Sequence, residues 1–196
     1  MRYKKSLLNY FLMSFFICFI SVPETWSLTA QQIAKNTFPS VVLLVMEDIN
    51  GQSVSMGSGF YINENTVVTN WHVIEGAVGG YAKFVGNNTT YKIAGTVGIE
   101  RNVDLVLLSI EGPAAPFLSI GNSGEVQIGD EVYAIGNPLG LEGTFSKGIV
   151  SGIRQIGSET IFQLSAPISL GSSGGPVLNI KGQVMGFREQ WNVKPC

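Results

Sequence analysis

The sequence predicts an all-β protein that is built from two consecutive units of similar size. Its candidate strands are short, rich in Val, Ile, Phe and Tyr, and separated by turn residues. Glycine occurs 24 times and charged residues make up only 13% of the chain, a mixture that suits tight turns better than solvated helices. Because helices do not alternate with the strands, a doubly wound α/β fold is excluded.

Residues 1–27 are predicted to be a secretory signal peptide. Basic residues open the chain, and an apolar run of about 16 residues follows from Leu7 to Val22, shorter than the ~20 residues of a membrane-spanning helix. Small side chains favour cleavage before Leu28, and the alternative is an uncleaved N-terminal anchor. In both cases the remaining chain is exported, to the periplasm or out of the cell. It then holds one cysteine, Cys196, so no intramolecular disulfide is expected.

The first unit, residues 28–112, is predicted to begin with a short helix. Thr29 and Gln32 have the spacing of a capping box, and the helix ends before Pro39. Six strands are expected after it: Val41–Met46, Ser55–Ile62, Thr66–Thr69, Tyr81–Phe84, Thr90–Val97 and Leu105–Ile110.

The second unit, residues 117–196, follows a linker at 111–116 that contains two prolines and has no periodicity. Two consecutive all-β units predict a pair of small barrels or sandwiches with a site in the crevice between them. Five strands are expected here, not six: Glu131–Ile135, Thr144–Ile153, Thr160–Leu164, Pro176–Leu178 and Gln183–Phe187.

The chain contains a single histidine, His72, which follows an apolar strand and precedes Glu75-Gly76, where a loop or short turn is expected. A lone histidine is more often packed or solvated than catalytic. Of the three aspartates, Asp48 and Asp130 lie in predicted turns. Asp104 differs because a buried strand starts directly after it, where a carboxylate needs a hydrogen-bond donor as its partner. A simple turn or strand-cap role for Asp104 remains open.

The segment Gly171-Ser172-Ser173-Gly174-Gly175-Pro176 is the most specific motif. Glycines on both sides of a serine let the backbone bend sharply, expose a hydroxyl and direct N–H groups toward one point. An activated serine with an oxyanion hole requires these features, and the alternative is a Ser/Gly-rich loop without chemistry.

Together these residues predict a triad in the chain order His, Asp, Ser. Ser173 is expected to attack a carbonyl, His72 to take and return its proton, and Asp104 to hold the imidazole tautomer. The backbone N–H groups of Gly171 and Ser173 would form the oxyanion hole. An esterase of the Gly-x-Ser-x-Gly type is disfavoured because its triad runs Ser, Asp, His.

Three segments resemble the catalytic motifs of trypsin-like serine proteases, and most of all those of the HtrA (Deg) family: Thr69–Val73, Asp104–Leu108 and Gly171–Pro176. Three further segments match the same family: Gly57–Phe60, Ala134–Pro138 and Gly148–Ser151. The resemblance implies a chymotrypsin-like fold of two six-stranded antiparallel β-barrels and cleavage of peptide bonds in unfolded exported proteins. It also implies polypeptide substrates and, by resemblance alone, a homotrimer. No cofactor and no metal are expected.

The same resemblance places the floor of the primary substrate pocket at Pro167, with Ile168 and Phe187 as further lining residues. No acidic residue occurs between Glu159 and Glu189, so the pocket lacks a carboxylate for Lys or Arg. Small or medium apolar side chains are therefore expected at the cleaved position.

Two departures from the family pattern leave a second interpretation open. The second barrel lacks its last strand as counted here, and the PDZ domain common in HtrA proteins is not expected in this chain. Ser172 stands where many digestive relatives have an aspartate that pairs with a new N-terminus, so activation by propeptide cleavage is not expected. The alternative function is a catalytically impaired or truncated protease-fold protein that binds extended peptides. A purely structural role would leave the triad unexplained.

The formal net charge is −2, and no block of basic residues occurs in the body of the chain. A surface for nucleic acid is therefore not expected.

Overall fold

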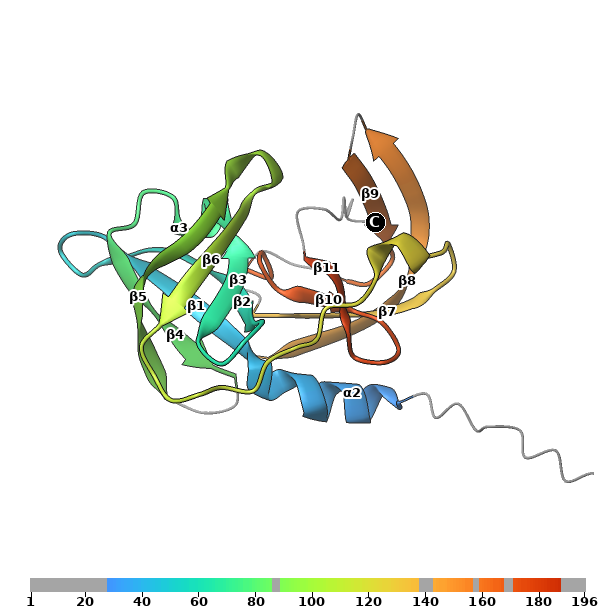
Figure 1. The fold of residues 1–196 in the computed structure, drawn as a ribbon, viewed down its shortest axis with the longest axis horizontal. Helices are drawn as coiled ribbons and strands as arrows, with labels where there is room; N and C mark the ends of the chain where they lie inside the picture. Colours follow the sequence, from blue (N-terminus) through green and yellow to red (C-terminus); the bar gives the residue numbers. More distant parts are fainter. Residues whose placement is uncertain (1–27, 86–88, 138–142, 157–158, 168–170, 188–196) are drawn as a thin grey trace, which may run out of the picture.

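The structure, a computed structural model, describes residues 28–85, 89–137, 143–156, 159–167 and 171–187. The predicted signal peptide and the chain after Phe187 lie outside this range. Within it, a closed barrel lies beside an open, curled sheet (Figure 1). This is the two-unit, mostly β architecture that the sequence predicts.

A short helix, α2 (Ala30–Thr37), leads into the first barrel. The predicted capping box is present, because the Thr29 hydroxyl accepts the Gln32 N–H at 3.2 Å and the Gln32 side chain accepts the Thr29 N–H at 2.8 Å. A 3₁₀ turn, η1 (Phe38–Ser40), then carries the chain into the first strand. Ile33 on α2 is fully buried, so the helix packs against the body of the protein.

The first unit is a closed barrel with the strand order β1-β2-β3-β6-β5-β4, in which β4 pairs with β1. All six strands are antiparallel to their neighbours, and their bounds agree with the predicted ones to within a few residues. They are β1 (Val41–Glu47), β2 (Ser53–Tyr61), β3 (Thr66–Asn70), β4 (Gly79–Phe84), β5 (Thr90–Glu100) and β6 (Leu105–Ile110).

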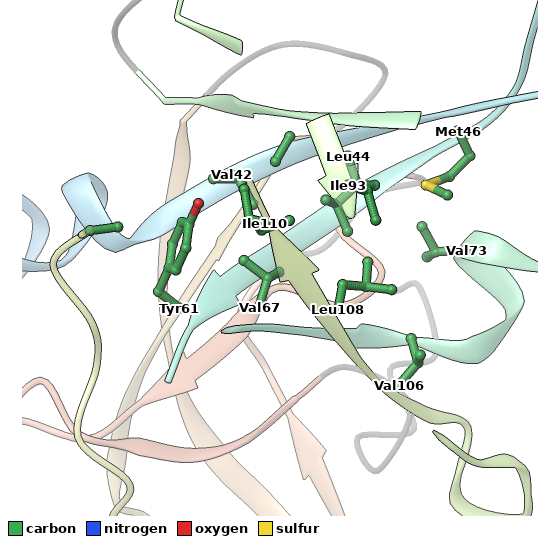
Figure 2. Packing of buried hydrophobic residues seen from close by; sticks show 12 residues of the cluster. Val42, Leu44, Met46, Tyr61, Val67, Val73, Ile93, Val106, Leu108 and Ile110 are labelled. Carbon is green, nitrogen blue, oxygen red and sulfur yellow. The ribbon is translucent and has the colours of Figure 1, made fainter. Parts of the chain in front are cut away.

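The barrel interior is filled by apolar side chains from every strand, and the contribution of β2 is Tyr61 (Figure 2). Val73 also belongs to this core although it lies outside the strands, on the short helix α3 (Trp71–Ile74). Val73 is 1% exposed, so its burial anchors α3 against the barrel.

The linker at 111–116 contains no helix or strand, as predicted, but it is held against the first barrel. Ala115 is buried, and its N–H donates to the carbonyl of Glu64 at 2.9 Å. Two residues beyond the linker, the Leu118 N–H donates to the carbonyl of Tyr61, also at 2.9 Å. Hydrogen bonds to the first barrel therefore hold the linker in a fixed position.

The second unit is an open sheet of five strands in the order β11-β10-β7-β8-β9. The five predicted strands are confirmed, and the part of the chain that the structure describes contains no sixth strand in this sheet. They are β7 (Glu131–Gly136), β8 (Thr144–Ile156), β9 (Glu159–Leu164), β10 (Pro176–Leu178) and β11 (Val184–Phe187).

A continuous apolar cluster joins the two units. Its buried members come from α2, from both sheets and from the chain between them: Ile33, Val41, Phe60, Val68, Leu118, Tyr133, Ile135, Leu178 and Val184. Because burial of apolar surface is the main favourable term in folding, this cluster fixes the position of the second sheet against the first barrel.

Candidate active site

His72 lies on α3, directly after the buried strand β3. The sequence predicts a loop or short turn here, and the structure has a single helical turn. Val73 points into the barrel core, whereas the His72 side chain is 43% exposed. The same short turn thus buries one residue as an anchor and presents the imidazole at the surface.

Asp104 contacts His72 at two points. Its Oδ2 lies 2.6 Å from Nδ1 of the imidazole, and its Oδ1 accepts the main-chain N–H of His72 at 2.9 Å. Asp104 follows the 3₁₀ turn η2 (Arg101–Val103) and has a left-handed backbone with φ 51°. Among the described residues it is the only non-glycine residue with positive φ. This backbone conformation aims the carboxylate at His72.

The contact with Asp104 determines which nitrogen of the His72 imidazole carries the proton. An ionised carboxylate only accepts hydrogen bonds, so the proton of the neutral ring belongs on Nδ1. Nε2 then carries the lone pair and is the nitrogen that can act as a base.

The other two aspartates are turn residues, as the sequence predicts. Asp48 Oδ1 accepts the N–H groups of Asn50 and Gln52 at 2.8 and 2.9 Å. These bonds, that of Gln52 above all, hold the pKa of Asp48 below its ordinary value. Asp130 accepts the N–H of Gln127 at 2.8 Å.

Ser173 occupies the second position of a tight turn. The carbonyl of Ser172 accepts the N–H of Gly175 at 3.0 Å, and Gly174 has φ 79° at the third position, where a type II turn requires positive φ. A Cβ at Gly174 would lie 2.2 Å from Thr69 Oγ1, and one at Gly175 would lie 2.1 Å from the carbonyl of Ile135. Glycine is therefore required at both positions, because the turn packs directly against both units.

The Ser173 turn lies next to the segment that carries His72. Gly57 of β2 stands between them, since a Cβ built there would be 2.6 Å from a methyl of Val73 and 3.3 Å from the Ser173 carbonyl. The Ser58 N–H donates to that carbonyl at 2.7 Å. The site thus draws His72 and Asp104 from the first unit and Ser173 from the second, at the junction of the two.

Gly171, the other expected oxyanion residue, is partly buried and has φ 90°. Its carbonyl accepts the Ser58 hydroxyl at 2.9 Å. Both residues expected to supply oxyanion N–H groups therefore have their carbonyl oxygens held by the same residue of β2.

Comparison with protein families matches residues 57–187 to the trypsin-like peptidase domain. The matched range contains His72, Asp104 and Ser173 and most of both sheets. The chain belongs to the trypsin-like peptidase family.

The relatives of this trypsin-like peptidase are HtrA and Deg proteins. A probable periplasmic serine endoprotease, DegP-like, from Chlamydia trachomatis is 42% identical over 137 residues, which is 66% of this chain and 27% of that protein. A putative serine protease HhoB from Synechocystis is 37% identical over 139 residues, 66% of this chain and 33% of that protein. The chain therefore spans about a quarter to a third of the length of these curated relatives.

Two solved structures share the architecture of this trypsin-like peptidase. The serine endoprotease from Yersinia pestis superimposes with a TM-score of 0.71 at 30% identity, covering 82% of this chain and 57% of that one. Deg5 superimposes with a TM-score of 0.69 at 31% identity, covering 79% of this chain and 81% of that one. The chymotrypsin-like fold class expected from the sequence is thus confirmed.

The expected substrate-pocket residues are not brought together in the described structure. Pro167 is exposed, and Ile168 lies outside the described residues. The backbone of Phe187 pairs with Pro176 at the end of β11, but its side chain is outside the described part. The pocket therefore stays a prediction.

Three buried polar residues around the site were not identified by sequence reasoning: Ser58, Asn70 and Asn137, each 0% exposed. All three fall in segments that resemble the HtrA family, and that resemblance was the signal in the sequence. Their roles depend on partners far away in the chain, which the sequence does not reveal.

Among the residues that the structure describes, no group of three His, Cys, Asp or Glu side chains could hold a metal ion. In the same residues, no helix has the length and apolar character needed to cross a membrane.

Proposed function

We propose that this chain is an exported serine endopeptidase of the HtrA type. The observation that supports the proposal most directly is the two-point contact between Asp104 and His72, at 2.6 and 2.9 Å. A carboxylate that holds both the ring and the backbone of a histidine sets its tautomer and its orientation, as a general base requires.

In the proposed mechanism, Ser173 Oγ attacks the carbonyl carbon of the scissile peptide bond while Nε2 of His72 takes its proton. The oxyanion that forms accepts hydrogen bonds from the N–H groups of Gly171 and Ser173. The imidazolium then gives the proton to the leaving amine, and Asp104 stabilises its positive charge. Water releases the acyl group by the same steps, so that Ser173 is regenerated.

The proposed substrates are unfolded polypeptides with small or medium apolar side chains at the cleaved position. The absence of an acidic residue between Glu159 and Glu189 supports this specificity, because a buried Lys or Arg would have no counter-charge. Cleavage of a peptide library mainly after Arg or Glu would contradict it.

The periplasm is the proposed compartment. Several relatives are named periplasmic serine endoproteases, and the predicted signal peptide agrees with export. A homo-oligomer is the proposed assembly, by family resemblance.

The first test is covalent labelling of the purified chain from Leu28 onward with a fluorophosphonate. Such a probe phosphonylates an activated serine and loses fluoride, so it reports an assembled base and oxyanion hole. We expect labelling of the wild type and none of Ser173→Ala, with His72→Ala reduced by at least about a thousandfold.

Absence of labelling in a wild-type chain that is folded by circular dichroism would contradict the endopeptidase. The peptide-binding alternative would then be favoured, and it predicts retention of extended peptides without their cleavage.

A further inference from the structure

We propose that Ser58, on the first barrel, is the residue that positions the nucleophile turn and its oxyanion donors. The inference rests on the proposed function and assigns a role to a residue outside the triad. Ser58 is 0% exposed on β2 and lies 113 positions before Gly171 in the sequence.

The Ser58 hydroxyl has all of its hydrogen-bonding capacity committed. A hydroxyl has one proton and two lone pairs. Both the main-chain N–H of Asn137, at 2.9 Å, and its side-chain amide, at 3.3 Å, donate to Ser58 Oγ. The single proton is therefore directed at the carbonyl of Gly171, 2.9 Å away.

Asn137 is itself held by further hydrogen bonds, so each residue of this hydrogen-bond network has a fixed position. Its side-chain amide also donates to the carbonyl of Val42 at 3.0 Å, and its Oδ1 accepts the N–H of Gly143 at 3.0 Å. Asn137 thus binds β1 and β2 of the first barrel from the end of β7. Buried polar networks that are fully satisfied in this way hold a single geometry.

Ser58 acts on both oxyanion residues at once. Its hydroxyl holds the carbonyl of Gly171, and its N–H holds the carbonyl of Ser173 at 2.7 Å. Because a peptide unit is planar, fixing these carbonyls fixes the planes of the peptide units that follow Gly171 and Ser173. The Ser173 N–H belongs to the peptide unit between them, whose carbonyl is held by Gly175. Ser58 therefore fixes, from the first barrel, the peptide units on either side of the one that carries the Ser173 N–H.

The test compares the full chain from Leu28 with Ser58→Ala, using a peptidyl diphenyl phosphonate with an apolar residue next to phosphorus. Ser173 Oγ displaces one phenolate from this probe, and the phosphoryl oxygen takes the place of the oxyanion. Saturation kinetics separate the limiting rate of reaction from the half-saturating concentration. We expect Ser58→Ala to lower the limiting rate by about 10- to 100-fold and to change the half-saturating concentration by less than about twofold.

The matched control is Thr37→Val. The Thr37 hydroxyl is also buried and donates to the Ile33 carbonyl at 2.7 Å, but it lies on α2, away from the site. We expect this variant to lose comparable stability and to react at the wild-type rate. If Ser58→Ala does not fold, Ser58→Cys preserves the volume with a weaker donor, and we expect an intermediate rate.

A folded Ser58→Ala or Ser58→Cys variant that reacts at the wild-type limiting rate would overturn the positioning role while leaving the endopeptidase intact. A wild-type chain that does not react at all would overturn the endopeptidase as well, so the two failures are distinguishable.

Discussion

Asp104 shows how one residue can be held in an unfavourable conformation for the benefit of a site. A left-handed backbone costs a residue with a Cβ about 1–2 kcal/mol. The Asp104 carbonyl accepts the Trp71 N–H and the Asn70 side-chain amide, both at 3.0 Å, and its carboxylate binds His72. These bonds offset the backbone cost and make the bend at Asp104 part of the site.

Asn70→Ala is expected to lower phosphonate reactivity by about tenfold, because Asp104 loses one of the two donors that hold its carbonyl. The effect on stability should be smaller than for a typical buried polar residue. Asn70 Oδ1 has no hydrogen-bond partner among the described residues, so the variant also removes an unsatisfied oxygen. The measurements are reaction kinetics and urea unfolding of the same samples.

Asn102→Ala is the control for this prediction, since Asn102 is exposed and lies two residues before Asp104. It should react at the wild-type rate. If Asn70→Ala also reacts with the phosphonate at the wild-type rate, the Trp71 N–H alone is sufficient to hold Asp104, and the prediction is contradicted.

At the residue scale, sequence reasoning singles out positions whose neighbours indicate a chemistry. His72, Asp104 and Ser173 each stand beside a strand or among glycines, and that local context is informative. Ser58 and Asn137 interact across 79 positions, and the family-like segments that contain them do not indicate this pairing. Buried polar partners of this kind become visible only in three dimensions.

The Ser173 turn is the element whose geometry is most tightly determined. Its backbone fits between β2, β3 and β7 without room for a side chain at Gly174 or Gly175. Two glycines in succession are therefore explained by space as well as by conformation.

Gly174→Ala is expected to abolish phosphonate labelling and to destabilise the fold by more than the cost of a left-handed alanine alone. The new Cβ would lie 2.2 Å from Thr69 Oγ1 and 2.3 Å from the Ser58 carbonyl, and a backbone oxygen cannot move aside cheaply. Labelling and urea unfolding would be measured together.

Gly51→Ala provides the matched comparison. Gly51 has φ 74°, close to the 79° of Gly174, but nothing lies within 4 Å of a Cβ built there. The Gly51→Ala substitution should therefore lower the free energy of unfolding by only about 1 kcal/mol and leave phosphonate labelling unchanged. Equal losses of stability in the two variants would contradict the steric argument.

At the element scale, the strands were predicted to within a few residues because their apolar stretches end at clear turns. The exceptions have physical reasons. Strand β5 was predicted to end at Val97, but it continues to Glu100 because β6 supplies backbone partners to an exposed segment. Helix α3 has four residues, too few for helical periodicity to be recognised.

At the scale of the whole molecule, the two units share one apolar cluster, and each unit contributes one fully buried tyrosine. Tyr61 lies in the barrel core and Tyr133 in the shared cluster, both 2% exposed. Burial raises the pKa of Tyr61 from 10.0 to about 12, with a smaller contribution from Tyr91. Burial and the hydrogen bond to Glu131 raise the pKa of Tyr133 to about 12.

Stability is therefore expected to fall as the pH rises from about 10 to about 12. Below pH 10 both tyrosines are neutral in the folded and the unfolded chain. Above it the unfolded chain loses protons that the folded chain retains, so unfolding is favoured. For Tyr61 the loss approaches about 2–3 kcal/mol at pH 12.

Tyr61→Phe keeps the ring that stacks on Phe84 at 5.5 Å and removes the ionisable group. Its free energy of unfolding should fall less steeply than that of the wild type between pH 10 and 12. Urea unfolding at pH 8, 10 and 11.5 would measure this. Parallel curves for the two proteins would contradict the prediction.

The dependence of the Ser173 turn on Ser58 also has a consequence for the order of events during folding. The six strands of the first barrel lie within residues 41–110, so that barrel can close before the rest of the chain is in place. At that stage the His72–Asp104 pair has all its parts, but the serine it would activate has no fixed direction. In the proposed endopeptidase, hydrolytic activity would therefore arise last, when the second sheet docks, and a half-folded copy could not cleave its neighbours.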